Sequence, residues 1–185
     1  MRKIVSAVFI TLGFFITIVR ADSVVDFPQS IKQRGDELLL NGTGIRRATL
    51  LRLKVYSAGL YLKQKSSNAD EILETIDPKQ IQMLFLREVA EEKIISTWLD
   101  GIKANNDRGE KWELPLKKLL EGIGDVKEGE RLILSMSETS VKLESSKGFS
   151  KEINQDSFGT ALLRIWLGPN PPDQELKEGL LGLKK

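Results

Sequence analysis

Residues 40–62 read LNGTGIRRATLLRLKVYSAGLYL, and this stretch determines most of what the sequence predicts about the fold. Asn41-Gly42 is typical of a tight turn between two strands, so the residues from Glu37 to Leu40 should form the strand before it. Beyond the turn, β-branched, aromatic and aliphatic residues continue from Arg46 to Leu62. Their alternation predicts one long strand that bends near Ala58-Gly59.

The segments that follow alternate between helical and strand periodicity. Their order is strands, helices, strands and again helices, which predicts a single α+β domain with a large antiparallel sheet covered on one side by helices. Helices are expected over residues 68–76, from 91 to 105, after Pro115, from 156 to 168 and over 173–181. Strands are expected over residues 80–87 and as a meander over 132–153.

The composition narrows the possible chemistry. The 185-residue chain contains no Cys and no His, which excludes disulfides, a thiolate nucleophile, an imidazole base and a Cys/His zinc site. We therefore expect no metal and no cofactor. The 28 basic and 26 acidic residues give a net charge of +2, which is too balanced to predict a nucleic-acid partner.

The N-terminal residues 1–21 have the layout of a secretory signal peptide. Arg2 and Lys3 precede an uncharged apolar run of 16 residues, and Ala21 suits a signal-peptidase site. The alternative is a retained membrane anchor, but the run is shorter than the roughly 20 residues that span a bilayer. We expect cleavage after Ala21, a domain over residues 22–185 with no stable membrane span, and a periplasmic location.

Several passages of this domain form a recognisable set, namely residues 40–46 with 53–62, residues 85–89 leading into the next helix, residues 158–168 and, more weakly, residues 176–182. Together they resemble the chalcone isomerase-like family, in particular its bacterial exported branch. The resemblance implies an open-faced β-sandwich, in which helices pack on one large antiparallel sheet and a ligand cleft lies between them.

The resemblance implies two different functions. In plant chalcone isomerases an Arg, a Thr, a Tyr and an Asn act in ring closure; here Arg46 matches the Arg, but the other positions fall on Tyr56, Ala90 and Thr97. Fatty-acid-binding proteins of this fold instead pair an Arg with the Tyr of a Lys-Val-Tyr motif, which matches residues 54–56. The resemblance favours a non-catalytic protein that binds a fatty acid or similar small amphiphilic carboxylate. The alternative is an isomerase or intramolecular lyase acting on a chalcone-like phenolic substrate.

Arg46 and Tyr56 are therefore the predicted ligand-binding residues. A guanidinium stays charged when desolvated and offers a planar fork to a carboxylate, and a Tyr hydroxyl can donate a further hydrogen bond. On one regular strand these residues would lie about 33 Å apart, so a bend or bulge is needed to bring them together. The sequence leaves open whether Arg46 or Arg47 points inward.

Other candidate groups have simpler structural explanations. Trp98, Trp166 and Phe158 lie on apolar helix faces, where aromatic residues usually belong to the core. Glu88 and its neighbours precede or begin a helix, where acidic side chains interact favourably with the helix dipole.

Overall fold

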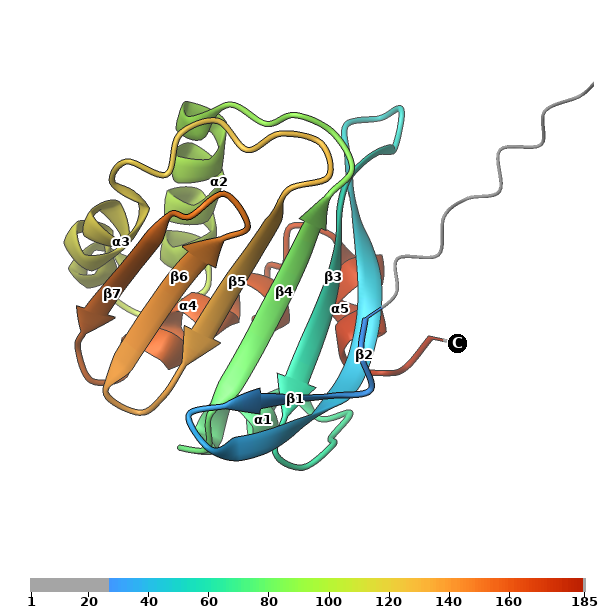
Figure 1. Cartoon of the computed structure of the whole chain (residues 1–185), viewed down its shortest axis with the longest axis vertical. Helices are drawn as coiled ribbons and strands as arrows, with labels where there is room; N and C mark the ends of the chain where they lie inside the picture. The colour runs from blue at the N-terminus through green and yellow to red at the C-terminus, as the bar shows by residue number, and fades with distance from the viewer. Residues whose placement is uncertain (1–26, 185) are drawn as a thin grey trace, which may run out of the picture.

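The structure is a computed structural model that describes residues 27–184, and in these residues seven strands form one antiparallel sheet in the order β1 to β7 (Figure 1). The segment expected to be a signal peptide lies outside the described residues. Each strand pairs with the strands that precede and follow it in sequence. The strands are β1 Ser30–Gln33, β2 Asp36–Ala48, β3 Leu53–Leu62, β4 Lys79–Phe85, β5 Arg131–Met136, β6 Ser140–Ser145 and β7 Ser150–Asn154.

The helices gather on one face of this sheet, as the sequence predicts (Figure 1). Their apolar faces and the inward side chains of β3 to β6 form the main core. No helix within residues 27–184 is long and apolar enough to cross a membrane. The helices are α1 Ala69–Glu74, α2 Glu91–Ala104, the 3-10 helix η1 Gly109–Trp112, α3 Glu113–Leu120, α4 Phe158–Leu167 and α5 Gln174–Leu180.

The expected starts of α1, α2 and α5 agree with the structure to within one residue, whereas α3 begins at Glu113, before Pro115 and not after it. Asn68 and Asp173 cap α1 and α5 through side-chain oxygens that accept backbone N–H groups of the first turn. The helix expected from residue 156 begins at Phe158, and Ser157 before it has a left-handed backbone and makes no capping hydrogen bond through its side chain. The start of α4 is therefore set by packing of its apolar face and not by a cap.

The predicted turn at Asn41-Gly42 is wrong. Strand β2 continues through these residues, with a β-bulge between Leu40 and Gly42. The reason is the close approach of α5, because a Cβ atom on Gly42 would lie 2.2 Å from the carbonyl oxygen of Gly179. Asn41 donates from its side chain to the Leu180 carbonyl over 2.8 Å, which holds the end of α5 against the strand. The Asn41-Gly42 pair therefore allows α5 to pack closely on strand β2 and does not form a turn.

The predicted long strand from Arg46 to Leu62 is also wrong, because the chain reverses at residues 49–52. Arg52 donates its backbone N–H to the Thr49 carbonyl over 3.0 Å, and this closes the turn of a β2–β3 hairpin. No bend occurs at Ala58-Gly59, which pairs regularly with β2 and β4. The turn was hidden from sequence analysis because its residues, Thr-Leu-Leu-Arg, include no Gly, Pro, Asn or Asp.

The face of the sheet that carries no helices is partly covered by the chain itself. The β1–β2 end curls back so that Phe27, Leu38 and Tyr61 form a second apolar cluster. Beside it, the Gln80 amide donates to the Gln33 side chain over 3.3 Å, which ties β4 to β1. The sheet is therefore curled like half of a barrel, and the ligand cleft expected between sheet and helices must lie on the opposite face.

Candidate functional site

The β2–β3 hairpin places Arg46 directly opposite Tyr56, since the two residues are Cα partners in the ladder. The expected separation along one strand is therefore wrong, and no bend is needed. A register shift between Arg46 and Arg47 then sends these neighbouring side chains to different surroundings. The two predicted ligand-binding residues come together because the chain turns between them.

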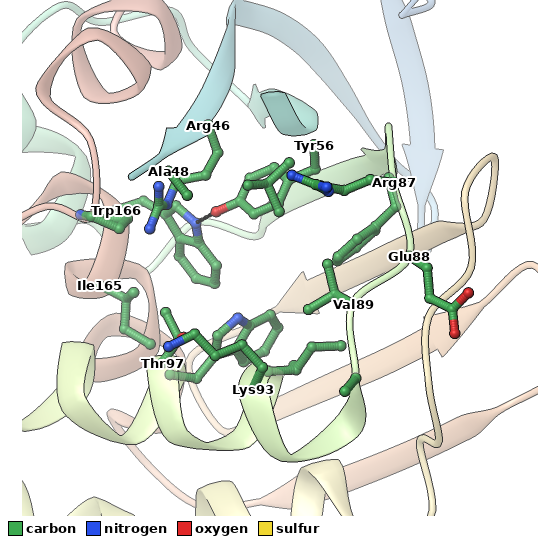
Figure 2. A pocket seen from close by; sticks show the side chains of 16 residues that line it. Arg46, Ala48, Tyr56, Arg87, Glu88, Val89, Lys93, Thr97, Ile165 and Trp166 are labelled. Carbon is green, nitrogen blue, oxygen red and sulfur yellow. Dashed lines mark hydrogen bonds between the residues drawn. The ribbon is translucent and has the colours of Figure 1, made fainter. Parts of the chain in front are cut away.

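Both residues line a cavity of about 390 Å³ between the sheet and helices α2 and α4 (Figure 2). Its wall is mainly apolar and aromatic, with a few charged groups. The lining residues are Arg46, Ala48, Val55, Tyr56, Phe85, Arg87, Glu88, Val89, Ala90, Lys93, Ile94, Thr97, Trp98, Ile165, Trp166 and Pro172.

Tyr56 is held firmly in this wall. Its side chain is only 7% exposed, its ring packs on that of Phe85 with centroids 5.5 Å apart, and its hydroxyl accepts the indole N–H of Trp166 over 3.0 Å. Burial raises the pKa of Tyr56 to about 12, so the hydroxyl keeps its proton at neutral pH. An indole N–H can only donate, so the Tyr56 proton remains available for another acceptor.

Arg46 is half-buried and lines the cavity next to this hydroxyl (Figure 2). Its guanidinium donates to the Arg47 carbonyl, and no carboxylate within the described part of the chain forms an ion pair with it. Its charge nevertheless acts on Tyr56, where it partly offsets the rise in pKa that burial causes. The cavity thus has one permanent cation beside one neutral hydroxyl donor.

Arg47 faces a different part of the protein and does not line the cavity. Its backbone N–H donates to the Asp173 carboxylate over 2.7 Å, and its guanidinium pairs with Glu175 at 3.2 Å. Of the two arginines that the sequence left open, Arg46 is the one beside the cavity, while Arg47 ties β2 to the start of α5.

Two further basic groups, which the sequence does not predict, lie at the cavity. Arg87 follows β4 and Lys93 lies in the first turn of α2, and neither forms an ion pair with a described carboxylate. Glu88 also borders the cavity, but its carboxylate points away and pairs with Lys127 (Figure 2). Both groups reach the cavity because α2 packs across the end of β4. No local pattern in the sequence predicts that contact.

Two of the three aromatic residues assigned to the core have a second role. Trp98 and Trp166 are buried in contact with each other, with ring centroids 5.2 Å apart, and both line the cavity. Phe158 is fully buried and stacks on Trp112, away from the cavity. Within residues 27–184, no three His, Cys, Asp or Glu side chains gather where they could hold a metal ion.

A curled antiparallel sheet with helices on one face and an apolar cavity between them defines the class of fold. The chain belongs to the chalcone isomerase-like family, whose model matches residues 21–182. Among solved structures, a fatty-acid-binding protein of Arabidopsis thaliana is similar, with a TM-score of 0.66 at 16% sequence identity over 84% of this chain and 90% of that chain. No curated protein matches the sequence. The predicted family and fold are confirmed.

Proposed function

We propose that this protein binds a fatty acid or a similar small amphiphilic carboxylate, with the acid group on Arg46 and Tyr56. One observation carries the proposal: a guanidinium without a described acidic partner and a protonated hydroxyl line the same apolar cavity. A carboxylate bound there would supply the partner that the Arg46 guanidinium lacks.

The hydrogen-bonding pattern suits a carboxylate head group. A carboxylate only accepts hydrogen bonds, and both Arg46 and Tyr56 have donors left for it. Trp166 fills one acceptor site of the Tyr56 hydroxyl, which makes that hydroxyl a donor toward the ligand. Two donors of this kind, one of them charged, favour an anion over a neutral alcohol or amide.

The rest of the cavity suits an apolar body of limited size. Its volume of about 390 Å³ lies in the range of pockets that hold small molecules. The aromatic rings of Phe85, Trp98 and Trp166 offer apolar surface beyond the polar end. The similar fold of a plant protein that binds fatty acids supports this class of ligand.

The direct test is to identify what the purified protein carries. We expect mass spectrometry of extracted lipids to find a fatty acid or related carboxylate in the wild-type protein and in an Arg47→Ala variant, which keeps the cavity cation. An Arg46→Ala variant should carry no such carboxylate. Equal, stoichiometric ligand in all three proteins would contradict the role of Arg46. The absence of bound ligand together with no measurable binding of added fatty acids would refute the proposal.

The alternative function, ring closure of a chalcone, is favoured by one observation, namely that Ala90 and Thr97 line the same cavity. These positions correspond, by resemblance, to a Tyr and an Asn of the plant isomerases. Ala90 has no group that could act on a substrate. We expect chalcone absorbance to decay at the spontaneous rate in the presence of the protein, and faster decay that depends on Arg46 would favour the isomerase.

We also propose that the protein is exported to the periplasm. The support is the sequence of residues 1–21, in which Arg2 and Lys3 precede an apolar run and the segment ends in Ala21. Intact-mass measurement of the protein purified from a periplasmic extract should correspond to a chain that begins at Asp22. Recovery of the full-length chain in the membrane fraction would contradict export as a processed protein.

A further inference from the structure

The turn of the β2–β3 hairpin exposes two leucines to solvent. Leu50 is fully exposed and Leu51 is 80% exposed, and these are the most exposed large apolar side chains in residues 27–184. Leu53, at the start of β3, extends the apolar surface of the turn. We call residues 49–53 the leucine tip. A lone exposed leucine needs no explanation, but a contiguous apolar tip indicates an interaction surface.

The backbone of the leucine tip is unfavourable for the residues that form it. Thr49 and Arg52 both adopt left-handed conformations, with φ of 63° and 51°. A β-branched residue such as Thr rarely takes this conformation, which Gly, Asn and Asp adopt more easily. The turn therefore holds backbone strain at Thr49 and Arg52, the residues that flank the two leucines, and such strain is often found at functional sites.

The leucine tip adjoins the cavity, and we take the open groove beside it as the cavity entrance. Ala48, the residue before it, lines the cavity, and Thr49 lines a shallower groove that shares Arg46, Ala48 and Lys93 with the cavity. In Figure 1 the hairpin projects past the end of β4, on the side where the chain leads into α2. A surface that received the leucines would thus meet the cavity entrance as well.

Basic residues outnumber acidic ones where the cavity and the adjoining groove are lined, since Glu88 and Asp100 are the acidic residues there and Glu88 is paired with Lys127. Arg46, Arg87 and Lys93 line the cavity without forming an ion pair to any described carboxylate. Arg52 of the tip and the nearby Arg47 pair through their guanidiniums with the single carboxylate of Glu175, and the Asp173 carboxylate accepts the backbone N–H of Arg47. Basic residues around a small apolar projection are the combination that anchors proteins at the interface of anionic membranes.

The shape of the tip favours a lipid surface over a protein partner. A stable protein interface buries about 800 Å² on each partner, which is much more than two leucine side chains at a narrow turn provide. Shallow insertion into lipid needs only a few apolar side chains and neighbouring basic groups. We propose that the leucine tip inserts into the interface of an anionic lipid bilayer and places the cavity entrance against the membrane.

A local fluorescence measurement tests this proposal. In a Leu50→Trp variant of the full chain, vesicles of phosphatidylglycerol and phosphatidylcholine should shift the emission of the new Trp to shorter wavelength, and brominated lipids should quench it. An Ile76→Trp variant is the matched control, because Ile76 is 69% exposed but follows α1 at the opposite end of the sheet. Its emission should stay unchanged. Equal effects in both variants, or none in either, would overturn the proposal.

A second experiment separates this proposal from the ligand proposal. Leu50→Ser with Leu51→Ser should lower the partition of the protein onto anionic vesicles by about tenfold or more, while an Ile76→Ser control keeps it. Binding of a water-soluble short-chain fatty acid should be equal in all three proteins, because the leucines do not line the cavity. Unchanged vesicle partition would refute the membrane role whatever the ligand result. Tip-dependent dimerisation without vesicle binding would assign the tip to a second copy of the chain and refute it as well.

Discussion

Trp166 of α4 donates its indole N–H to the hydroxyl of Tyr56 on β3 over 3.0 Å, across the wall of the cavity. The bond joins a helix to the sheet and uses an acceptor site of the hydroxyl. Since both side chains are buried, the hydroxyl orientation is fixed before any ligand arrives. Because the hydroxyl is already ordered, ligand binding loses less conformational entropy.

Removing the hydroxyl should weaken ligand binding. We expect Tyr56→Phe to lower the affinity for a fatty acid about tenfold, the size of one hydrogen bond to a charged group, as measured by isothermal titration calorimetry. Tyr61→Phe on the same strand, outside the cavity, should leave affinity unchanged. Equal affinity of the wild type and Tyr56→Phe would show that the hydroxyl does not contact the ligand.

Changing Arg46 should separate the effect of charge from that of geometry. Arg46→Lys keeps the cation but loses the planar fork, so we expect an affinity loss of about tenfold, and about a hundredfold for Arg46→Ala. Arg47→Lys serves as the matched control, since Arg47 does not line the cavity. An equal loss of affinity in Arg47→Lys and Arg46→Lys would contradict the assignment of the ligand head group to Arg46.

Stability should fall at alkaline pH because of Tyr56. Its pKa of about 12 in the folded protein exceeds the ordinary value of 10.0, so folding favours the protonated, neutral form. This contribution is fully present below about pH 10 and is lost as the pH rises through about 12, a decrease of up to about 3 kcal/mol. Urea unfolding across this range should show a shallower decline for Tyr56→Phe than for the wild type. Equal declines of the free energy of unfolding in the two proteins would contradict the contribution of Tyr56.

The contact between β2 and α5 should tolerate no side chain at Gly42. A methyl group there would meet the Gly179 carbonyl oxygen at 2.2 Å, so we expect Gly42→Ala to lower the free energy of unfolding by about 2–4 kcal/mol. Thr43→Ala, at the next and exposed position, should change it by about 0.5 kcal/mol or less. Thermal unfolding compares the two variants, and a neutral Gly42→Ala would show that α5 can move away from the strand.

Most of the fold could be predicted because its elements repeat local patterns. The helical spacing of Ile94, Trp98 and Ile102 and the capping residue Asn68 identify α2 and α1 from neighbouring residues alone. The β2–β3 hairpin could not be predicted, since Asn41-Gly42 has turn chemistry and lies inside a strand, while Leu50-Leu51 has none and forms the turn. At Asn41-Gly42 the distant contact with α5 decides the structure, whereas the turn at residues 49–52 is closed by its own backbone hydrogen bond.

The site could be predicted only in part for the same reason. Arg46 and Tyr56 follow from the resemblance to a family, and the hairpin brings them together as Cα partners. The contribution of Trp166, 110 residues away from Tyr56, exists only through packing of α4 on the sheet. Arg87 likewise reaches the cavity through the placement of α2 across the end of β4.

The order of the strands in the sheet has a consequence for how the chain folds. Most neighbouring strands are separated by short connections and can pair as soon as they are synthesised, because closing a short loop loses little entropy. The exception is the pairing of β4 with β5, which must wait for the segment from residue 86 to residue 130. Until then the backbone edge of β4, which becomes the centre of the finished sheet, remains open. Aggregation during folding should therefore begin at β4, through pairing with the same edge of another nascent chain.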